Sequence, residues 1–178
     1  MIILLLLCLL ASSYQTKPRA VDQIDREKLK QQAQELSDAV VSGNYARAAD
    51  LTFPKLVKLM GGRQQFIATM EKAMAETSTD QFRISSVTVG EPGEIIQVNR
   101  QHYAIVSSTM RFKVAEGTLV GEAFMIGVSA DGGKNWAFID SGGRAIDKNQ
   151  LRTLIGPAAD KLRIPETKRP VLHRGANE

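Results

Sequence analysis

The chain has 178 residues, of which 43% are hydrophobic and 24% are charged, and its formal net charge is +4. This length and mixture are typical of one globular domain. They exclude wholesale disorder, a collagen-like fibre, a disulfide-rich miniprotein and a protein with several membrane spans. The composition therefore predicts a folded domain that is stabilised by a hydrophobic core.

The N-terminal residues are predicted to be a secretory signal peptide. Ile2–Ala11 is an unbroken apolar run, about 15 Å long as a helix and hence about half of a bilayer core. Small residues follow it, as a cleavage site requires. We therefore expect a signal peptide at residues 1–13, a linker at 14–24, a secreted or periplasmic location and no stable membrane span after cleavage. The alternative is a buried N-terminal helix.

The sequence contains one cysteine, Cys8, which lies inside the predicted signal peptide. A lipoprotein signal needs a small residue directly before the cysteine, and Leu7 stands there, so lipidation is disfavoured. The mature chain would have no disulfide, and its core alone would have to stabilise it.

Residues 25–77 show the hydrophobic periodicity of three amphipathic helices. The first ends where Gly43 suits a C′ position and Asn44 suits the N-cap of the next helix. The second is broken and restarted around Pro54, and glycines 61 and 62 end it. The third is expected at residues 65–77.

From residue 82 the hydrophobic period changes to two, which is typical of strands. Short turns between these segments predict antiparallel neighbours. On the longest segment both faces carry apolar residues, so the pattern leaves open which face the helices cover. The expected strands are residues 82–89, 94–98, 102–114, 118–129 and 135–141.

The C-terminal part is expected to be less regular. Residues 147–156 are predicted to form a short helix. Residues 157–178 hold three of the six prolines, five basic and three acidic side chains, and few apolar ones. This composition predicts a flexible tail.

Two segments carry a family resemblance. They are GNYARAADLTFP at residues 43–54 and NWAFID at residues 135–140. With the order of helices followed by long antiparallel strands, they make residues 25–146 resemble the nuclear transport factor 2-like superfamily, whose cone-shaped fold is shared with ketosteroid isomerase and SnoaL-type cyclases. The resemblance implies an α+β fold in which three N-terminal helices pack on a curved antiparallel sheet as a cone-like roll. It also implies a pocket open at one end, without implying a reaction.

A second, shorter resemblance concerns residues 129–136. Ser129, Asp131, Gly133 and Trp136 fit the S-x-D-x-G-x-x-W pattern of the Asp-box found in sialidase-like propellers. A propeller needs several copies of this motif, and the chain has one. We therefore interpret it as a stable hairpin between the last two long strands, with the tryptophan packed beneath it.

Few residues suit catalysis or metal binding. After signal cleavage the chain has no cysteine and two histidines, and it lacks nucleotide-binding and nucleophile-elbow motifs, so we expect no metal and no cofactor. Asp140 and Tyr103 are the candidates for acid–base catalysis, and Arg111 joins them as a candidate ligand contact. The alternatives are structural: Asp140 would cap its own turn, Tyr103 would be a half-buried strand aromatic, and Arg111 would lie on a solvated face. His102 is expected in solvent.

Three functions remain open. The first is a non-catalytic module that binds a small apolar ligand or a protein partner, and the second is an isomerase- or cyclase-like enzyme. The third is a homodimer assembled through the open sheet face, by Tyr103, Ile105 and Thr109 or by the opposite set of the same strand. Nucleic acid is not an expected partner, because residues 17–156 carry 18 basic against 16 acidic side chains.

Overall fold

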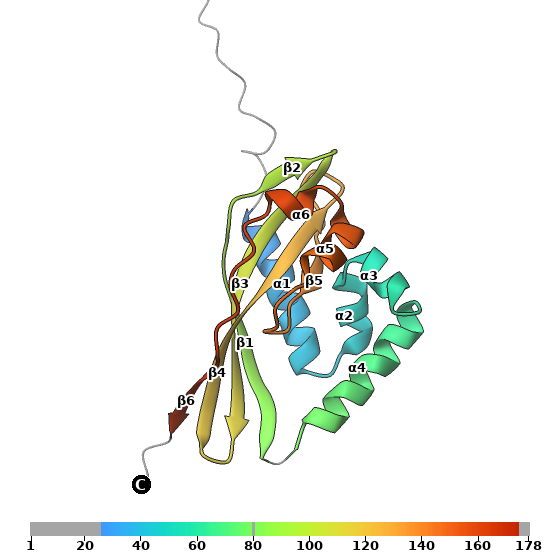
Figure 1. Ribbon diagram of the computed structural model, residues 1–178. Helices are drawn as coiled ribbons and strands as arrows, with labels where there is room; N and C mark the ends of the chain where they lie inside the picture. Colours follow the sequence, from blue (N-terminus) through green and yellow to red (C-terminus); the bar gives the residue numbers. More distant parts are fainter. Residues whose placement is uncertain (1–25, 80, 175–178) are drawn as a thin grey trace, which may run out of the picture.

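The protein has a mixed α+β fold in which helices pack on a six-stranded, open antiparallel sheet (Figure 1). The computed structural model describes residues 26–79 and 81–174. The expected signal peptide at 1–13 and the linker at 14–24 lie outside the described residues. Among the residues described, no helix has both the length and the apolar character needed to cross a bilayer.

Four helices precede the sheet in the described part of the chain, where the sequence predicts three. The second predicted helix is two helices, because Thr52 and Phe53 are extended and Phe53 N–H bonds to the carbonyl of Phe138 in the sheet. Gly43 has a positive φ and the Asn44 side chain accepts a hydrogen bond from Arg47 N–H, as predicted. The helices are α1 (Arg26–Val41), α2 (Tyr45–Leu51), α3 (Pro54–Leu59) and α4 (Arg63–Thr77).

The sheet has the order β1-β3-β4-β5, and two short strands extend it. β2 pairs with β3, and β6 pairs with the beginning of β4 on the same edge that pairs with β5 further along. All these pairs are antiparallel. The strands are β1 (Phe82–Pro92), β2 (Ile96–Val98), β3 (Gln101–Val114), β4 (Gly117–Ser129), β5 (Ala137–Asp140) and β6 (Val171–Arg174).

Helices cover both faces of the sheet, each over a different hydrophobic cluster. On one face, Leu29 of α1 and Ala48 of α2 belong to a cluster with Val106 of β3 and Met125 of β4. Trp136, whose burial the sequence predicts, and Phe138 fill the same cluster. The opposite face is covered by α5 (Lys148–Ile155) and α6 (Ala158–Lys161). One end of the sheet therefore lies between two layers of helices.

The C-terminal segment differs from the expected flexible tail. The sequence predicts a helix at 147–156, and α5 matches it, with the Asp147 side chain accepting a hydrogen bond from Gln150 N–H. Beyond it, α6 and β6 form within the expected tail. Three kinds of contact hold this segment: Ala158, Ala159 and Leu162 are buried in the cluster under α5 and α6, Lys168 pairs with Glu122 at 2.9 Å, and β6 completes backbone bonds on the outer edge of β4. Sheet pairing of this kind does not depend on apolar side chains, so composition alone misses it.

His102 is buried, although the sequence places it in solvent. The turn before it contains two residues, Asn99 and Arg100, both with positive φ, so Gln101 already pairs with Val98. This two-residue hairpin places His102 inside the sheet between Gln97 and Ser129, where it is 5% exposed. Within the described residues neither of its ring nitrogens has a hydrogen-bond partner.

The loop between β4 and β5 is closed by the residues of the Asp-box pattern. The Ser129 hydroxyl donates to the Asp131 carboxylate at 2.9 Å and accepts from Gly133 N–H. Asp131 also accepts from both the backbone and the side chain of Asn135, and Trp136 Nε1 donates to the Gly133 carbonyl at 3.0 Å. The pattern therefore builds a hydrogen-bonded loop over a buried tryptophan.

Candidate functional site

One half of one sheet face carries apolar side chains that no helix buries. The side chains of residues paired across neighbouring strands point to the same face of a sheet. The register of β1, β3 and β4 therefore shows which side chains lie on the face that α1 covers, also at the end of the sheet beyond α1. There the side chains are half-buried or exposed, with Phe82 at 36% and Leu172 at 38%. We call this surface the open apolar face. It comprises Phe82, Ile84, Val87, Met110, Phe112, Val114, Leu119 and Leu172.

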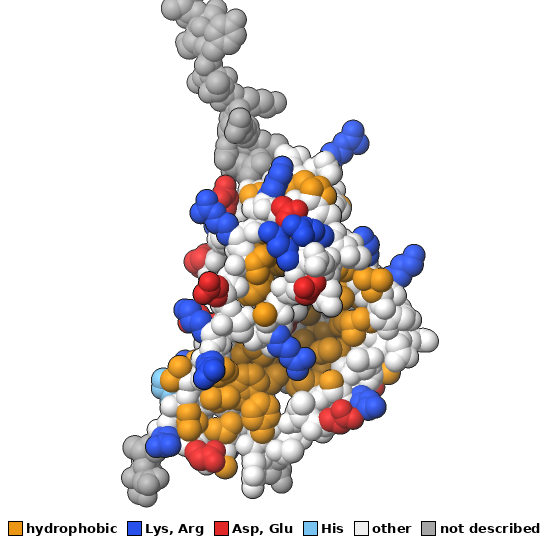
Figure 2. Space-filling model, in the orientation of Figure 1, with side chains coloured by type: hydrophobic (Ala, Val, Ile, Leu, Met, Phe, Trp, Pro, Cys, Tyr) orange, Lys and Arg blue, Asp and Glu red, His pale blue; other side chains and the backbone are white. Residues whose placement is uncertain are grey.

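Four strands contribute to one continuous row across this face. Ile84 of β1 lies opposite Phe112 of β3, which lies opposite Leu119 of β4, which lies opposite Leu172 of β6. The Phe82 ring stacks on the Phe112 ring with centroids 5.2 Å apart. None of the eight side chains is charged. In Figure 2 apolar side chains gather over the lower part of the sheet and continue into a hollow toward the helices.

Helix α4 lies across from the lower part of the sheet (Figure 1). Its apolar stripe includes the half-buried Met70 and Met74. Met74 lines a pocket of ≈ 490 Å³ together with Tyr45 of α2 and Ile84 of the open apolar face. The sheet and α4 therefore face each other across one open groove, and Ser78, Arg83 and Ser85 add polar groups to the lining of its pocket. Methionine makes the α4 wall adaptable because its side chain is flexible and polarizable.

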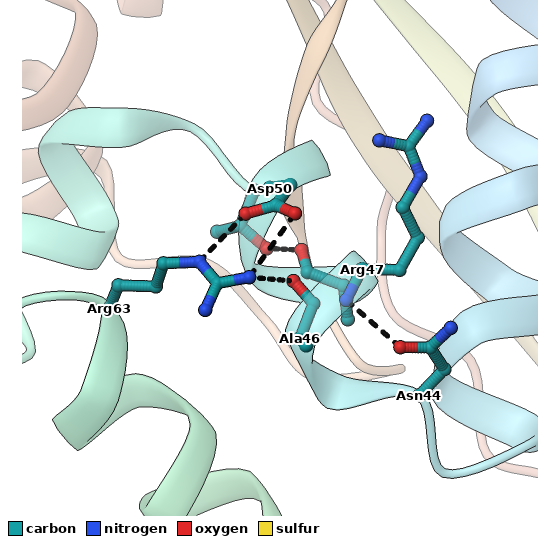
Figure 3. A network of polar contacts seen from close by, with 7 residues as sticks. Asn44, Ala46, Arg47, Asp50 and Arg63 are labelled. Carbon is teal, nitrogen blue, oxygen red and sulfur yellow. Dashed lines mark hydrogen bonds and ion pairs between the residues drawn. The ribbon is translucent and has the colours of Figure 1, made fainter.

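A polar network at its first turn fixes α4 to α2 (Figure 3). The Arg63 guanidinium donates to the Asp50 carboxylate at 2.8 Å and to the Ala46 carbonyl at 3.2 Å. The hydrogen bond from Arg63 holds the pKa of the Asp50 carboxyl below its ordinary value. Because both side chains are about half exposed, the pair contributes little to stability, and we interpret it as orienting α4.

Tyr103 lies outside this groove. It is 3% exposed on the opposite sheet face, within the cluster that α5 and α6 cover, and its hydroxyl donates to the Gln101 side chain at 2.7 Å. Burial raises the pKa of the phenol above its ordinary value. The surface by which Tyr103 and Ile105 could contact a second copy is therefore occupied by the chain's own C-terminal helices.

Asp140 ends β5, and its carboxylate accepts a hydrogen bond from Gly142 N–H at 2.9 Å. The residue keeps an exposed surface, yet the protein around its carboxyl raises the pKa by excluding water, and the Gly142 bond acts in the opposite direction. This geometry corresponds to the turn-capping alternative.

The three candidate residues from the sequence do not converge. Arg111 is exposed, and it lies eight residues from Tyr103 on the same strand, a separation of about 26 Å. Asp140 pairs with Met125, which pairs with Val106, so these three side chains share one sheet face. Tyr103 and Arg111 lie on the opposite face. These side chains are therefore too far apart, or on opposite sheet faces, to act on one substrate as an acid–base pair.

No metal-binding cluster of three or more His, Cys, Asp or Glu side chains occurs among residues 26–79 and 81–174. The groove offers mainly the apolar surface of the open apolar face, and Tyr45 and Arg83 are the titratable residues that line its pocket. Its chemistry is therefore suited to binding by exclusion of water.

Part of the groove was visible in the sequence. The alternation on β3 already placed Met110, Phe112 and Val114 on one face, and the periodicity of α4 included Met74. Leu172 was missed because it lies in a segment that reads as a polar tail. The exposed Val-Leu pair between Pro170 and His173 was the only local signal of a strand there.

Comparisons of the chain with protein-family models, curated proteins and solved structures find no match.

Proposed function

We propose that the protein is a secreted or periplasmic, non-catalytic module that binds a small apolar ligand in the groove between the open apolar face and α4. The observation that carries the proposal is the row Ile84–Phe112–Leu119–Leu172, which spans four strands and is left uncovered. A monomeric protein rarely leaves an apolar patch this continuous in water unless the patch binds something.

We further propose that the fold is a cone-like roll of the nuclear transport factor 2-like kind, with the groove as the mouth of its cone. Helices that precede an antiparallel sheet and cover one end of it support this proposal. The location outside the cytoplasm rests on the apolar run Ile2–Ala11.

The proposal is tested by native mass spectrometry of the purified protein and by titration with a fluorescent apolar probe. We expect probe binding that Phe112→Gln weakens at least tenfold, because the substitution replaces the centre of the row with an amide. Arg111→Gln is the matched control, since it changes the adjacent side chain on the opposite face.

The proposal would be contradicted if the wild-type protein bound no probe and carried no co-purified ligand. Equal weakening by both variants would also contradict it, because the probe would then bind elsewhere.

The same face also supports the alternative of a homodimer, in which two open apolar faces cover each other. Light scattering at micromolar concentration distinguishes the two functions. A monomer that binds the probe favours the ligand, whereas a dimer that Phe112→Gln dissociates favours assembly.

A further inference from the structure

The net charge of the chain is confined to its C-terminal segment. Residues 1–140 contain 15 basic and 15 acidic side chains, whereas residues 141–178 contain eight basic and four acidic ones. The whole formal charge of +4 therefore belongs to the last 38 residues. A local excess of this kind directs electrostatic attraction to one part of the surface.

Five of these eight cations have no acidic partner. Lys148 and Arg152 pair with Asp160, and Lys168 pairs with Glu122. The other five side chains are exposed, and their charged groups have no ion pair or hydrogen bond within the part of the chain that the structure describes. They are Arg144, Lys161, Arg163, Arg169 and Arg174.

The segment runs along one side of the molecule, from α5 and α6 at one end of the sheet to β6 at the other (Figure 1). Figure 2, in the same orientation, shows Lys and Arg side chains along this side, with Asp and Glu side chains between them. Within β6, Val171 is 59% exposed and stands between Arg169 and Arg174. The segment thus combines unpaired cations with an apolar side chain in water.

We propose that this C-terminal surface docks the protein on an anionic phospholipid bilayer. Each cation near such a surface strengthens binding, and an apolar side chain beside the cations can enter the headgroup boundary. A soluble polyanion would match the charges but would offer nothing to Val171. The proposal does not rest on the proposed function, because none of the five cations belongs to the open apolar face, although β6 also contributes Leu172 to that face.

The test is co-sedimentation of the full chain with vesicles of phosphatidylcholine alone or of phosphatidylcholine with about 40% phosphatidylglycerol, which gives the vesicle a negative surface potential. We expect binding to the anionic vesicles only, weakened by raising the salt from about 0.05 M to about 0.5 M. The triple variant R163Q/R169Q/R174Q should bind about a hundredfold more weakly.

Two further variants make the result specific. K58Q/R100Q/K134Q also removes three exposed cations, but outside the segment, and should retain wild-type binding. Val171→Thr keeps a β-branched residue in β6 and should weaken vesicle binding about threefold while leaving binding to heparin unchanged. Circular dichroism checks that each variant is folded.

Several outcomes would overturn the proposal. They are absence of binding to anionic vesicles, equal binding to neutral ones, or an equal loss in both triple variants. Binding to heparin as tight as to vesicles, with no effect of Val171→Thr, would assign the surface to a soluble polyanion instead.

Discussion

At the scale of single residues, Asp131 shows how a motif becomes a local structure. Its carboxylate accepts hydrogen bonds from Ser129 and from the backbone and side chain of Asn135. These bonds, led by that from the Asn135 backbone, lower the pKa of Asp131 to about 2. The ionised form is therefore bound more tightly in the folded state than in the unfolded chain.

This shift predicts a dependence of stability on pH. Because the folded pKa lies below the ordinary value of 3.8, the stabilisation is fully present above about pH 4 and is lost as the pH falls through about 2. Asp131→Asn should lower stability at pH 7 by about 1 kcal/mol or less, since the residue is exposed, and should flatten the pH dependence below pH 4.

Urea denaturation between pH 2 and pH 7 measures both effects. Glu94→Gln is the control, because this exposed carboxylate has no hydrogen-bond or ion-pair partner among the described residues. An unchanged slope below pH 4 in Asp131→Asn would show that the loop bonds do not persist in solution.

At the scale of elements, α1 protects the free edge of β1. The Gln34 side chain donates to the Val87 carbonyl at 2.9 Å and accepts from Val89 N–H at 2.9 Å, so its amide replaces a neighbouring strand. Lys30 of α1 also pairs with Glu91 further along the same strand. An edge covered in this way is less available for pairing with other chains.

Removing this amide should be costly. Gln34→Ala leaves one partly buried donor and one acceptor without partners, and we expect a loss of about 1–3 kcal/mol in the free energy of unfolding. Gln31→Ala, on the exposed side of the same helix, should change it by less than about 0.5 kcal/mol.

Chemical denaturation compares the two variants directly. Equal stability of Gln34→Ala and Gln31→Ala would contradict the assignment of Gln34 as a substitute strand. Slower amide exchange at Val89 in the wild type than in Gln34→Ala would support it independently.

At the scale of the whole molecule, the sheet joins two hydrophobic clusters that share no helix. Leu29 anchors the cluster under α1, and Leu151 anchors the cluster under α5 and α6, with exposed fractions of 0% and 1%. Strands β3 and β4 contribute side chains to both. This sharing makes the two helical layers parts of one cooperative unit.

We expect Leu29→Ala and Leu151→Ala each to lower the free energy of unfolding by about 2–4 kcal/mol. Both variants should unfold in one transition, and Trp136 fluorescence and circular dichroism should report the same midpoint. Leu59→Ala, at a position 62% exposed, is the control and should stay close to the wild type. If Leu151→Ala left the midpoint of Trp136 fluorescence unchanged, the C-terminal helices would be a separate unit.

The sequence by itself determined the local elements. Gly43 and Asn44 marked the boundary of α1 and α2, and the period-two runs located β1, β3 and β4 within a few residues. The motif around Asp131 also predicted the hairpin loop that its hydrogen bonds close. These features depend on neighbours within about four residues, which a sequence displays directly.

The tertiary structure alone decided which surfaces are covered. Both faces of β3 carry apolar side chains, so alternation cannot say that α5 and α6 bury Tyr103 while Phe112 stays open. The pairing of β6 with β4, which brings Leu172 beside Leu119, joins residues more than 50 positions apart. Burial and pairing over such separations depend on how the whole chain packs, and no local pattern encodes them.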